Sequence, residues 1–109
     1  MKALTGIKVV DLTHVLSGPY CTMVLGDMGA DVVKVEQYPN GDTIRTMPPL
    51  INGESYGFSM VNRNKKSLRL NLRKEKALEI LYKLVETADI FIENFRPGVT
   101  KKLGIDYET

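Results

Sequence analysis

Residues 7–36 read IKVVDLTHVLSGPYCTMVLGDMGADVVKVE, and this stretch decides the fold of the chain. Its first six residues form an apolar, largely β-branched run, which predicts a buried strand. A helix is expected next, because Ser17 can cap its start, Pro19 suits its first turn and Gly29 suits its end. Residues 31–36 then predict a second strand. A strand, a helix and a strand in this order predict two parallel strands joined by a right-handed crossover.

The same pattern returns in the second half of the chain. Residues 67–72 predict a third strand, 74–88 an amphipathic helix and 89–94 a fourth strand, followed by a short helix around 99–103. Between the two halves, residues 37–62 are rich in Pro, Gly and Asn, and they give few signals of a regular element. The expected fold class is therefore α/β, with a parallel sheet and flanking helices.

Length and composition set limits on the class of protein. A chain of 109 residues forms one domain at most, and 43% apolar with 26% charged residues is ordinary for a globular protein. No apolar run approaches the roughly 20 residues of a membrane span, and the first residues are too polar for a signal peptide. The single cysteine, Cys21, cannot form an internal disulfide, which favours a reducing cytoplasm.

Positive charge is concentrated in one segment of the second half. Between residues 63 and 76 a single carboxylate, Glu75, accompanies seven cations: Arg63, Lys65, Lys66, Arg69, Arg73, Lys74 and Lys76. The whole chain has a formal net charge of only +2. A small acidic ligand with phosphate groups would suit such a patch. A solvated charged rim is the other interpretation, and spacing alone leaves both open.

Ligands of parallel α/β sheets bind beyond the carboxyl ends of the strands. That rule selects three segments that follow expected strands, residues 14–18, 36–41 and 94–98. Backbone N–H groups of Gly18 and Tyr20 could bind an anion at the helix start, although most helix starts bind only water.

Few single side chains in the sequence indicate a reaction. His14 is a candidate base or ligand contact, and a structural role is the alternative. Cys21 in the first helical turn is either a reactive thiol or a small packed residue. No pattern indicates a metal site, a catalytic triad or a P-loop. The sequence thus indicates a place to bind a ligand more clearly than a place to react with it.

Several ordered motifs resemble those of one enzyme family. They are Gly18-Pro19-Tyr20-Cys21, residues 25–36, Pro39-Asn40-Gly41-Asp42 with Arg45, residues 62–67, residues 88–98 and residues 103–107. With these motifs the chain resembles the amino terminus of the family III CoA transferases (CaiB/BaiF type), relatives of formyl-CoA transferase and alpha-methylacyl-CoA racemase. The resemblance extends over essentially the whole chain.

The resemblance implies a fold, a ligand and an assembly. Residues 1–109 would be the amino-terminal part of a Rossmann-like CoA-binding domain, without the smaller domain of the family, and the full-length protein would be a homodimer of interlocked chains. Coenzyme A and acyl-CoA would be substrates, with no tightly bound cofactor. By position, the expected CoA contacts are Val15, Leu16 and Ser17 along the CoA path, Leu70 at the adenine, Asn94 and Phe95 near the pantetheine arm, and Lys102 at the phosphates.

One position departs from the family pattern. After Glu36 the family commonly carries an arginine that serves the adenosine end of CoA, whereas this chain has Gln37. Losing a charged hydrogen bond typically costs about 1.5–3 kcal/mol, so weaker CoA binding is expected. Arg45, Lys65 and Lys66 are the cations expected to compensate.

The resemblance also implies a reaction whose key group lies outside this chain. Family members use an aspartate that forms a mixed anhydride with the acyl group and then an aspartyl-CoA thioester. By the family pattern this aspartate lies beyond Thr109, so no residue here is expected to be catalytic and the chain alone is expected to be inactive. The expected function is CoA transfer from an acyl-CoA donor to a carboxylic acid, in the cytoplasm, without nucleic-acid or membrane partners.

Two alternatives stay open from the residues themselves. In a dinucleotide-binding domain, Glu36 would bind the ribose, because it ends a strand 18 residues after Gly18. Against this, Gly18, Gly26 and Gly29 do not form the G-x-G-x-x-G turn. The second alternative is a noncatalytic remnant that retains a CoA site.

Overall fold

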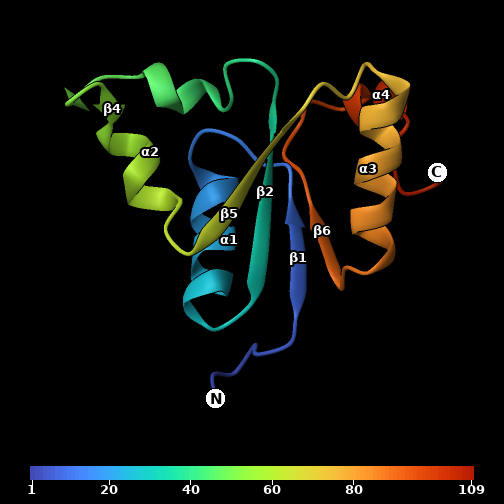
Figure 1. Ribbon diagram of the computed structural model, residues 1–109, viewed down its shortest axis with the longest axis horizontal. Helices are drawn as coiled ribbons and strands as arrows, with labels where there is room; N and C mark the ends of the chain where they lie inside the picture. The colour runs from blue at the N-terminus through green and yellow to red at the C-terminus, as the bar shows by residue number, and fades with distance from the viewer.

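A parallel sheet of four strands forms the centre of the protein. The computed structural model describes residues 1–109 and shows the strands in the order β5-β2-β1-β6 (Figure 1). Their bounds are Lys8–Asp11 for β1, Asp31–Gln37 for β2, Lys65–Leu70 for β5 and Ile90–Ile92 for β6. All pairs are parallel, which confirms the expected α/β class. Counted along the chain, these four strands lie in the order 3-2-1-4, which is part of the order 3-2-1-4-5-6 of a doubly wound sheet.

Helices cover both faces of the sheet. Helix α1 (Ser17–Asp27) connects β1 to β2, and α3 (Glu75–Glu86) connects β5 to β6 in the opposite direction along the sheet. Two right-handed crossovers in opposite directions place their helices on opposite faces. The short helix α4 (Val99–Leu103) lies beside α3 (Figure 1). None of these helices has the length and apolar character of a membrane span.

The apolar core is divided between the two faces. On the α3 face, buried side chains of the strands pack with Leu81 of α3, which is fully buried. On the α1 face, a smaller cluster contains Val9, Ala30 and Val32, with Leu25 of α1 packed against it. Alternation along each strand explains the division, since successive side chains point to opposite faces.

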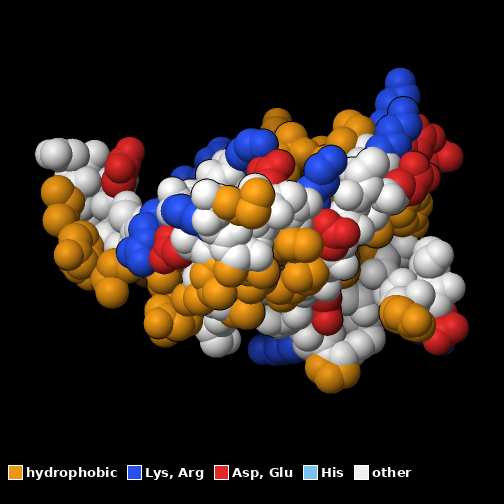
Figure 2. All heavy atoms as spheres, turned by 90° about the horizontal axis from the view of Figure 1, so that it is seen from below, with side chains coloured by type: hydrophobic (Ala, Val, Ile, Leu, Met, Phe, Trp, Pro, Cys, Tyr) orange, Lys and Arg blue, Asp and Glu red, His pale blue; other side chains and the backbone are white.

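Residues 43–61 form an arm that projects from the sheet (Figure 1). The arm contains a 3-10 helix η1 (Thr43–Thr46), an antiparallel hairpin of β3 (Leu50–Ile51) and β4 (Glu54–Ser55), and helix α2 (Tyr56–Val61). The sequence signals few regular elements here, yet these four short ones are present. The hairpin turns at Asn52-Gly53, where both residues have positive φ, a strong hairpin signal. Several apolar side chains of the arm are exposed, including Leu50 and Ile51. Figure 2 shows hydrophobic side chains gathered on the projecting arm.

Local details of α1 differ from the expected ones. The residue before the helix is Leu16, and no side chain caps it, so the expected Ser17 cap is wrong. The N–H of Tyr20 donates to the carbonyl of Leu16 at 2.9 Å and is not free for an anion. Gly29 follows the helix with a φ of 104°, which confirms the expected end.

The third strand begins two residues earlier than expected, at Lys65 rather than Ser67. Lys65 pairs with Val32 of β2 in the parallel register, so the cationic residues are part of the sheet and not of a loop before it. A lysine can occupy this position because its ammonium group meets a buried carboxylate, that of Asp11.

Candidate functional site

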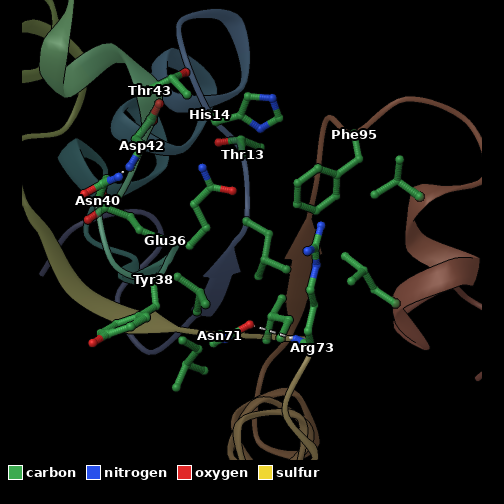
Figure 3. A pocket seen from close by; sticks show the side chains of 18 of the residues that line it. Thr13, His14, Glu36, Tyr38, Asn40, Asp42, Thr43, Asn71, Arg73 and Phe95 are labelled. Carbon is green, nitrogen blue, oxygen red and sulfur yellow. Dashed lines mark hydrogen bonds between the residues drawn. The ribbon is translucent and has the colours of Figure 1, made fainter.

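A cleft of about 690 Å³ opens at the carboxyl ends of the four strands (Figure 3). Segments that follow β1, β2, β5 and β6 contribute its walls, as the strand-end rule predicts. Apolar side chains such as Leu12, Val35 and Leu70 line it, together with the polar Asn40 and Asn71 and with charged groups of both signs. Apolar side chains and polar groups that converge on one cleft are usual for a small-molecule site.

Five of the twelve expected ligand contacts line this cleft. They are His14, Gln37, Leu70, Phe95 and Lys102. The ring centroids of His14 and Phe95 are 5.4 Å apart with an angle of 33° between the planes, so two neighbouring strand ends present a joint aromatic surface.

Two cations line the cleft, Arg73 and Lys102. Arg73 lies between β5 and α3, and its backbone N–H donates to Oδ1 of Asn71 at 3.2 Å. Figure 3 shows its side chain extending into the cleft. Arg73 belongs to the cationic segment of the sequence but was not among the expected site residues. Its position three residues after Leu70, where β5 ends, was the signal that could have identified it.

The other cations of the segment 63–76 do not form a single patch. The side chain of Lys65 is 2% exposed, and Nζ donates to the carbonyl of Pro19 and to Oδ1 of Asn62. Lys66 points to the opposite face and pairs with Asp31 at the amino end of β2. Neither lysine lines the cleft, so the expectation of one cationic patch is wrong. The cause is strand alternation, which sends neighbouring side chains to opposite faces.

Arg45 also has a partner within the protein. Its Nε and Nη2 donate to the two carboxylate oxygens of Glu36 at 2.7 and 2.8 Å, and its guanidinium lies 3.7 Å from the ring centroid of Phe58. These contacts fix the guanidinium of Arg45 between Glu36 of the sheet and Phe58 of the arm. Arg45 is not among the residues that line the cleft. None of Arg45, Lys65 and Lys66 therefore stands free beside Gln37 to compensate for its missing charge.

The remaining expected contacts lie in the turns beside the cleft. Asn94 holds the backbone of His14, because its Oδ1 accepts the N–H at 3.0 Å and its Nδ2 donates to the carbonyl at 2.9 Å. Val15 and Leu16 lie in the turn between β1 and α1, Ser17 is the first residue of α1, and Leu16 and Ser17 are exposed. These four residues do not line the cleft itself.

Comparison with known proteins identifies the family. The model of CoA-transferase family III matches residues 4–109. This chain belongs to CoA-transferase family III. The match confirms the resemblance seen in the sequence motifs.

Individual relatives of this family III chain are similar over its whole length. Succinyl-CoA:mesaconate CoA-transferase of Haloarcula marismortui is 53% identical over 114 residues, which cover 100% of this chain and 28% of that protein. Succinyl-CoA:glutarate CoA-transferase of Homo sapiens is 46% identical over 109 residues, 99% of this chain and 25% of that protein. The chain thus spans little more than a quarter of the length of these relatives.

A solved structure shows the same arrangement of elements. The crystal structure of a CaiB/BaiF family protein from Brucella suis superposes with a TM-score of 0.91 at 42% sequence identity, and covers 98% of this chain and 29% of that one.

The carboxylate of Glu36 is fully engaged in this family III chain. Besides the two hydrogen bonds from Arg45, the carboxylate accepts one from the N–H of Asp42 at 2.8 Å and one from Oγ of Ser67 at 2.7 Å. Burial by itself raises the pKa of Glu36, but these hydrogen bonds outweigh it and lower the pKa to about 2. A carboxylate with this many partners has no free acceptor for a ribose hydroxyl, which argues against the dinucleotide interpretation.

Proposed function

We propose that this chain forms the CoA-binding part of an enzyme that transfers CoA from an acyl-CoA donor to a carboxylic acid. The observation that carries the proposal is the cleft at the strand ends, with a mixed apolar and polar lining that includes Arg73 and Lys102, in a chain of CoA-transferase family III. Such a cleft suits a nucleotide whose adenine needs apolar contact and whose phosphates need positive charge.

Each part of the cleft then has a role toward CoA. Arg73 and Lys102 bind phosphate oxygens, and Leu70 contacts the adenine. The joint surface of His14 and Phe95 receives the start of the pantetheine arm, and Asn94 fixes the backbone of His14 beneath it. Gln37 offers a neutral hydrogen bond where the family pattern has an arginine, so the adenosine end is held less tightly.

The reaction itself uses a residue outside these 109 positions. The proposed nucleophile is an aspartate of the complete enzyme, which forms an acyl anhydride and then an aspartyl-CoA thioester. This chain contributes binding, orientation and shielding of the CoA moiety. The proposal includes a Rossmann-like domain, a homodimer and a cytoplasmic location. Because two relatives are named for transfer from succinyl-CoA to mesaconate or glutarate, we propose a dicarboxylic acid as acceptor.

A titration with CoA tests the binding part of the proposal. The polypeptide that the gene encodes in full is titrated calorimetrically with CoA, dephospho-CoA and NAD. We expect CoA to bind more tightly than NAD, and Lys102→Ala to weaken CoA binding about tenfold through loss of a charged hydrogen bond. Lys101→Ala is the matched control, since Lys101 is on the same short helix but does not line the cleft.

The other outcomes of the titration contradict specific parts of the proposal. Equal affinity for CoA and NAD would favour a general dinucleotide site. Equal losses in the two lysine variants would mean that Lys102 acts only through net charge. Binding of CoA without any exchange between succinyl-CoA and a dicarboxylic acid would leave a noncatalytic CoA site.

A further inference from the structure

The turn between β1 and α1 is held by side chains from three other segments. Asn94, after β6, holds both backbone groups of His14. Lys34 of β2 donates from Nζ to the carbonyl of Thr13 at 2.9 Å. Asp42, after β2, accepts the N–H of Val15 with Oδ1 at 3.1 Å and Oδ2 at 3.2 Å. Four consecutive backbone groups are thus fixed from outside the turn.

Val15 has a backbone conformation that needs such support. Its φ is 71°, in the left-handed region. A β-branched residue is an outlier there, because its side chain crowds the backbone, and such residues persist only where the surroundings impose them. The N–H of Val15 points to the carboxylate of Asp42, so this carboxylate is the direct restraint on the unfavourable conformation.

Asp42 is itself held rigidly. It pairs with Nζ of Lys34 at 3.0 Å, and each of the two side chains is 1% exposed. Its Oδ1 also accepts the N–H of Ile44 at 3.1 Å, and its own N–H donates to Glu36. Figure 3 shows Asp42, Thr13 and His14 together at one end of the cleft. The buried ion pair therefore connects β2 with the loop that follows it, and each partner also hydrogen-bonds the backbone after β1.

We infer that Asp42, oriented by Lys34, is a positioning residue that holds the turn of residues 14–16 in its ligand-binding shape. The turn lies where β1 and β6 are neighbours, the switch point of the sheet, and it brings His14 to the cleft. Without the carboxylate, Val15 returns to negative φ and the turn leaves this shape. The ligand meant here is the CoA moiety, and its identity rests on the proposed function.

Amide hydrogen exchange tests the restraint directly, without any ligand. In Asp42→Asn, we expect exchange at residues 14–16 to become about tenfold faster or more, because a charge-assisted hydrogen bond is lost. Thr22→Val is the matched control: Thr22 is in the same buried layer, and its Oγ1 donates to Asp11 and makes no hydrogen bond to residues 14–16. Thr22→Val should lower the global stability of the protein without faster exchange confined to residues 14–16. Equal exchange at residues 14–16 in both variants would overturn the inference.

Val15→Gly gives a second variant, because glycine adopts a φ of 71° without strain. Val15→Gly/Asp42→Asn should exchange more slowly at residues 14–16 than Asp42→Asn alone. Asp42→Asn also leaves the buried ammonium group of Lys34 without its carboxylate, so Lys34→Met/Asp42→Asn is the background for the same comparison if Asp42→Asn fails to fold. If Val15→Gly does not slow exchange at residues 14–16 in either background, Asp42 does not act through Val15.

CoA titration of the same variants in the protein that the gene encodes in full links the turn to the ligand. We expect Asp42→Asn to weaken CoA binding and Thr22→Val to leave it unchanged at a temperature where both are folded. Faster local exchange with unchanged CoA affinity would overturn the positioning role. Failure of the wild-type protein to bind CoA would instead refute the proposed function, and the exchange data would still decide whether Asp42 holds the turn.

Discussion

At the scale of single residues, Glu36 shows how a sequence signal for function can have a structural cause. Its position at the end of a strand resembles that of a ribose-binding acid, yet its carboxylate joins the sheet to the arm through Arg45 and to β5 through Ser67. Its hydrogen bonds to Arg45, Asp42 and Ser67 leave the carboxylate of Glu36 no free acceptor for a ribose hydroxyl. The residue instead stabilises the loop that contains Asp42.

The lowered pKa of Glu36 predicts how stability depends on pH. The pKa is 4.5 ordinarily and about 2 in the folded protein. The ionised group therefore contributes stability that is fully present above pH 4.5 and is lost as the pH falls toward 2. The shift corresponds to about 3 kcal/mol. Glu36→Gln should lower the free energy of unfolding at pH 6, measured in urea, and this deficit should shrink steadily between pH 4.5 and 2.

An exposed glutamate provides the control for this pH series. Glu86→Gln, at the end of α3, should give a curve parallel to that of the wild-type protein. A deficit for Glu36→Gln that is constant from pH 6 to pH 2 would show that the carboxylate charge is not the source of its stabilisation.

At the scale of elements, segments with a clear period or clear end signals could be predicted, and the short elements of the arm could not. The strand at residues 31–36, the helix at 74–88 and the helix at 99–103 have clear periodicity or end signals, and all three are present. The hairpin and α2 are only a few residues long, so no period develops, and only Asn52-Gly53 gave a local signal. The start of β5 was missed because a buried lysine depends on Asp11, which is distant in sequence.

Helix α1 offers a prediction from two of its glycines. Replacing glycine by alanine in a helix interior usually stabilises by about 0.5–1 kcal/mol. At Gly26, an added Cβ would have its nearest contact at 3.4 Å, so Gly26→Ala should follow this rule. At Gly18, the added Cβ would lie 2.4 Å from Cβ of Thr13, so Gly18→Ala should destabilise and disturb the turn before the helix. Thermal unfolding of both variants tests the difference, and equal effects would contradict this packing argument.

At the scale of the whole molecule, the two faces of the sheet are built differently. The α3 face is an apolar core, whereas the α1 face contains the ion pairs Lys34–Asp42 and Lys65–Asp11, both buried, and Arg45–Glu36 beside them. All buried polar side-chain atoms have a hydrogen-bond partner. This charged layer supports the turns on which the cleft depends.

The candidate site could be predicted from the sequence only in part, because the charged layer depends on pairs of residues that are far apart in the sequence. The strand-end rule correctly places His14, Gln37 and Phe95 at the cleft, because it depends only on strand order and direction. The roles of the cations depend on which face each one occupies and on carboxylates far along the chain. Thus Lys65, which is conspicuous in sequence, is buried, while Arg73 reaches the cleft.

The pair Lys65–Asp11 predicts how strongly the fold depends on this charged layer. Burial lowers the pKa of Lys65, and the charge of Asp11 opposes that effect. Lys65→Met would leave the carboxylate of Asp11, which is fully buried, without its cation, at a cost of about 3–5 kcal/mol. Adding Asp11→Asn removes the unpaired charge, so the double variant should be more stable than Lys65→Met alone. Urea unfolding of the four proteins in the double-mutant cycle measures this coupling. Additive losses would show that the two charges are stabilised independently, by the hydrogen bonds of Thr13 and Thr22 to Asp11 and of Lys65 to Pro19 and Asn62.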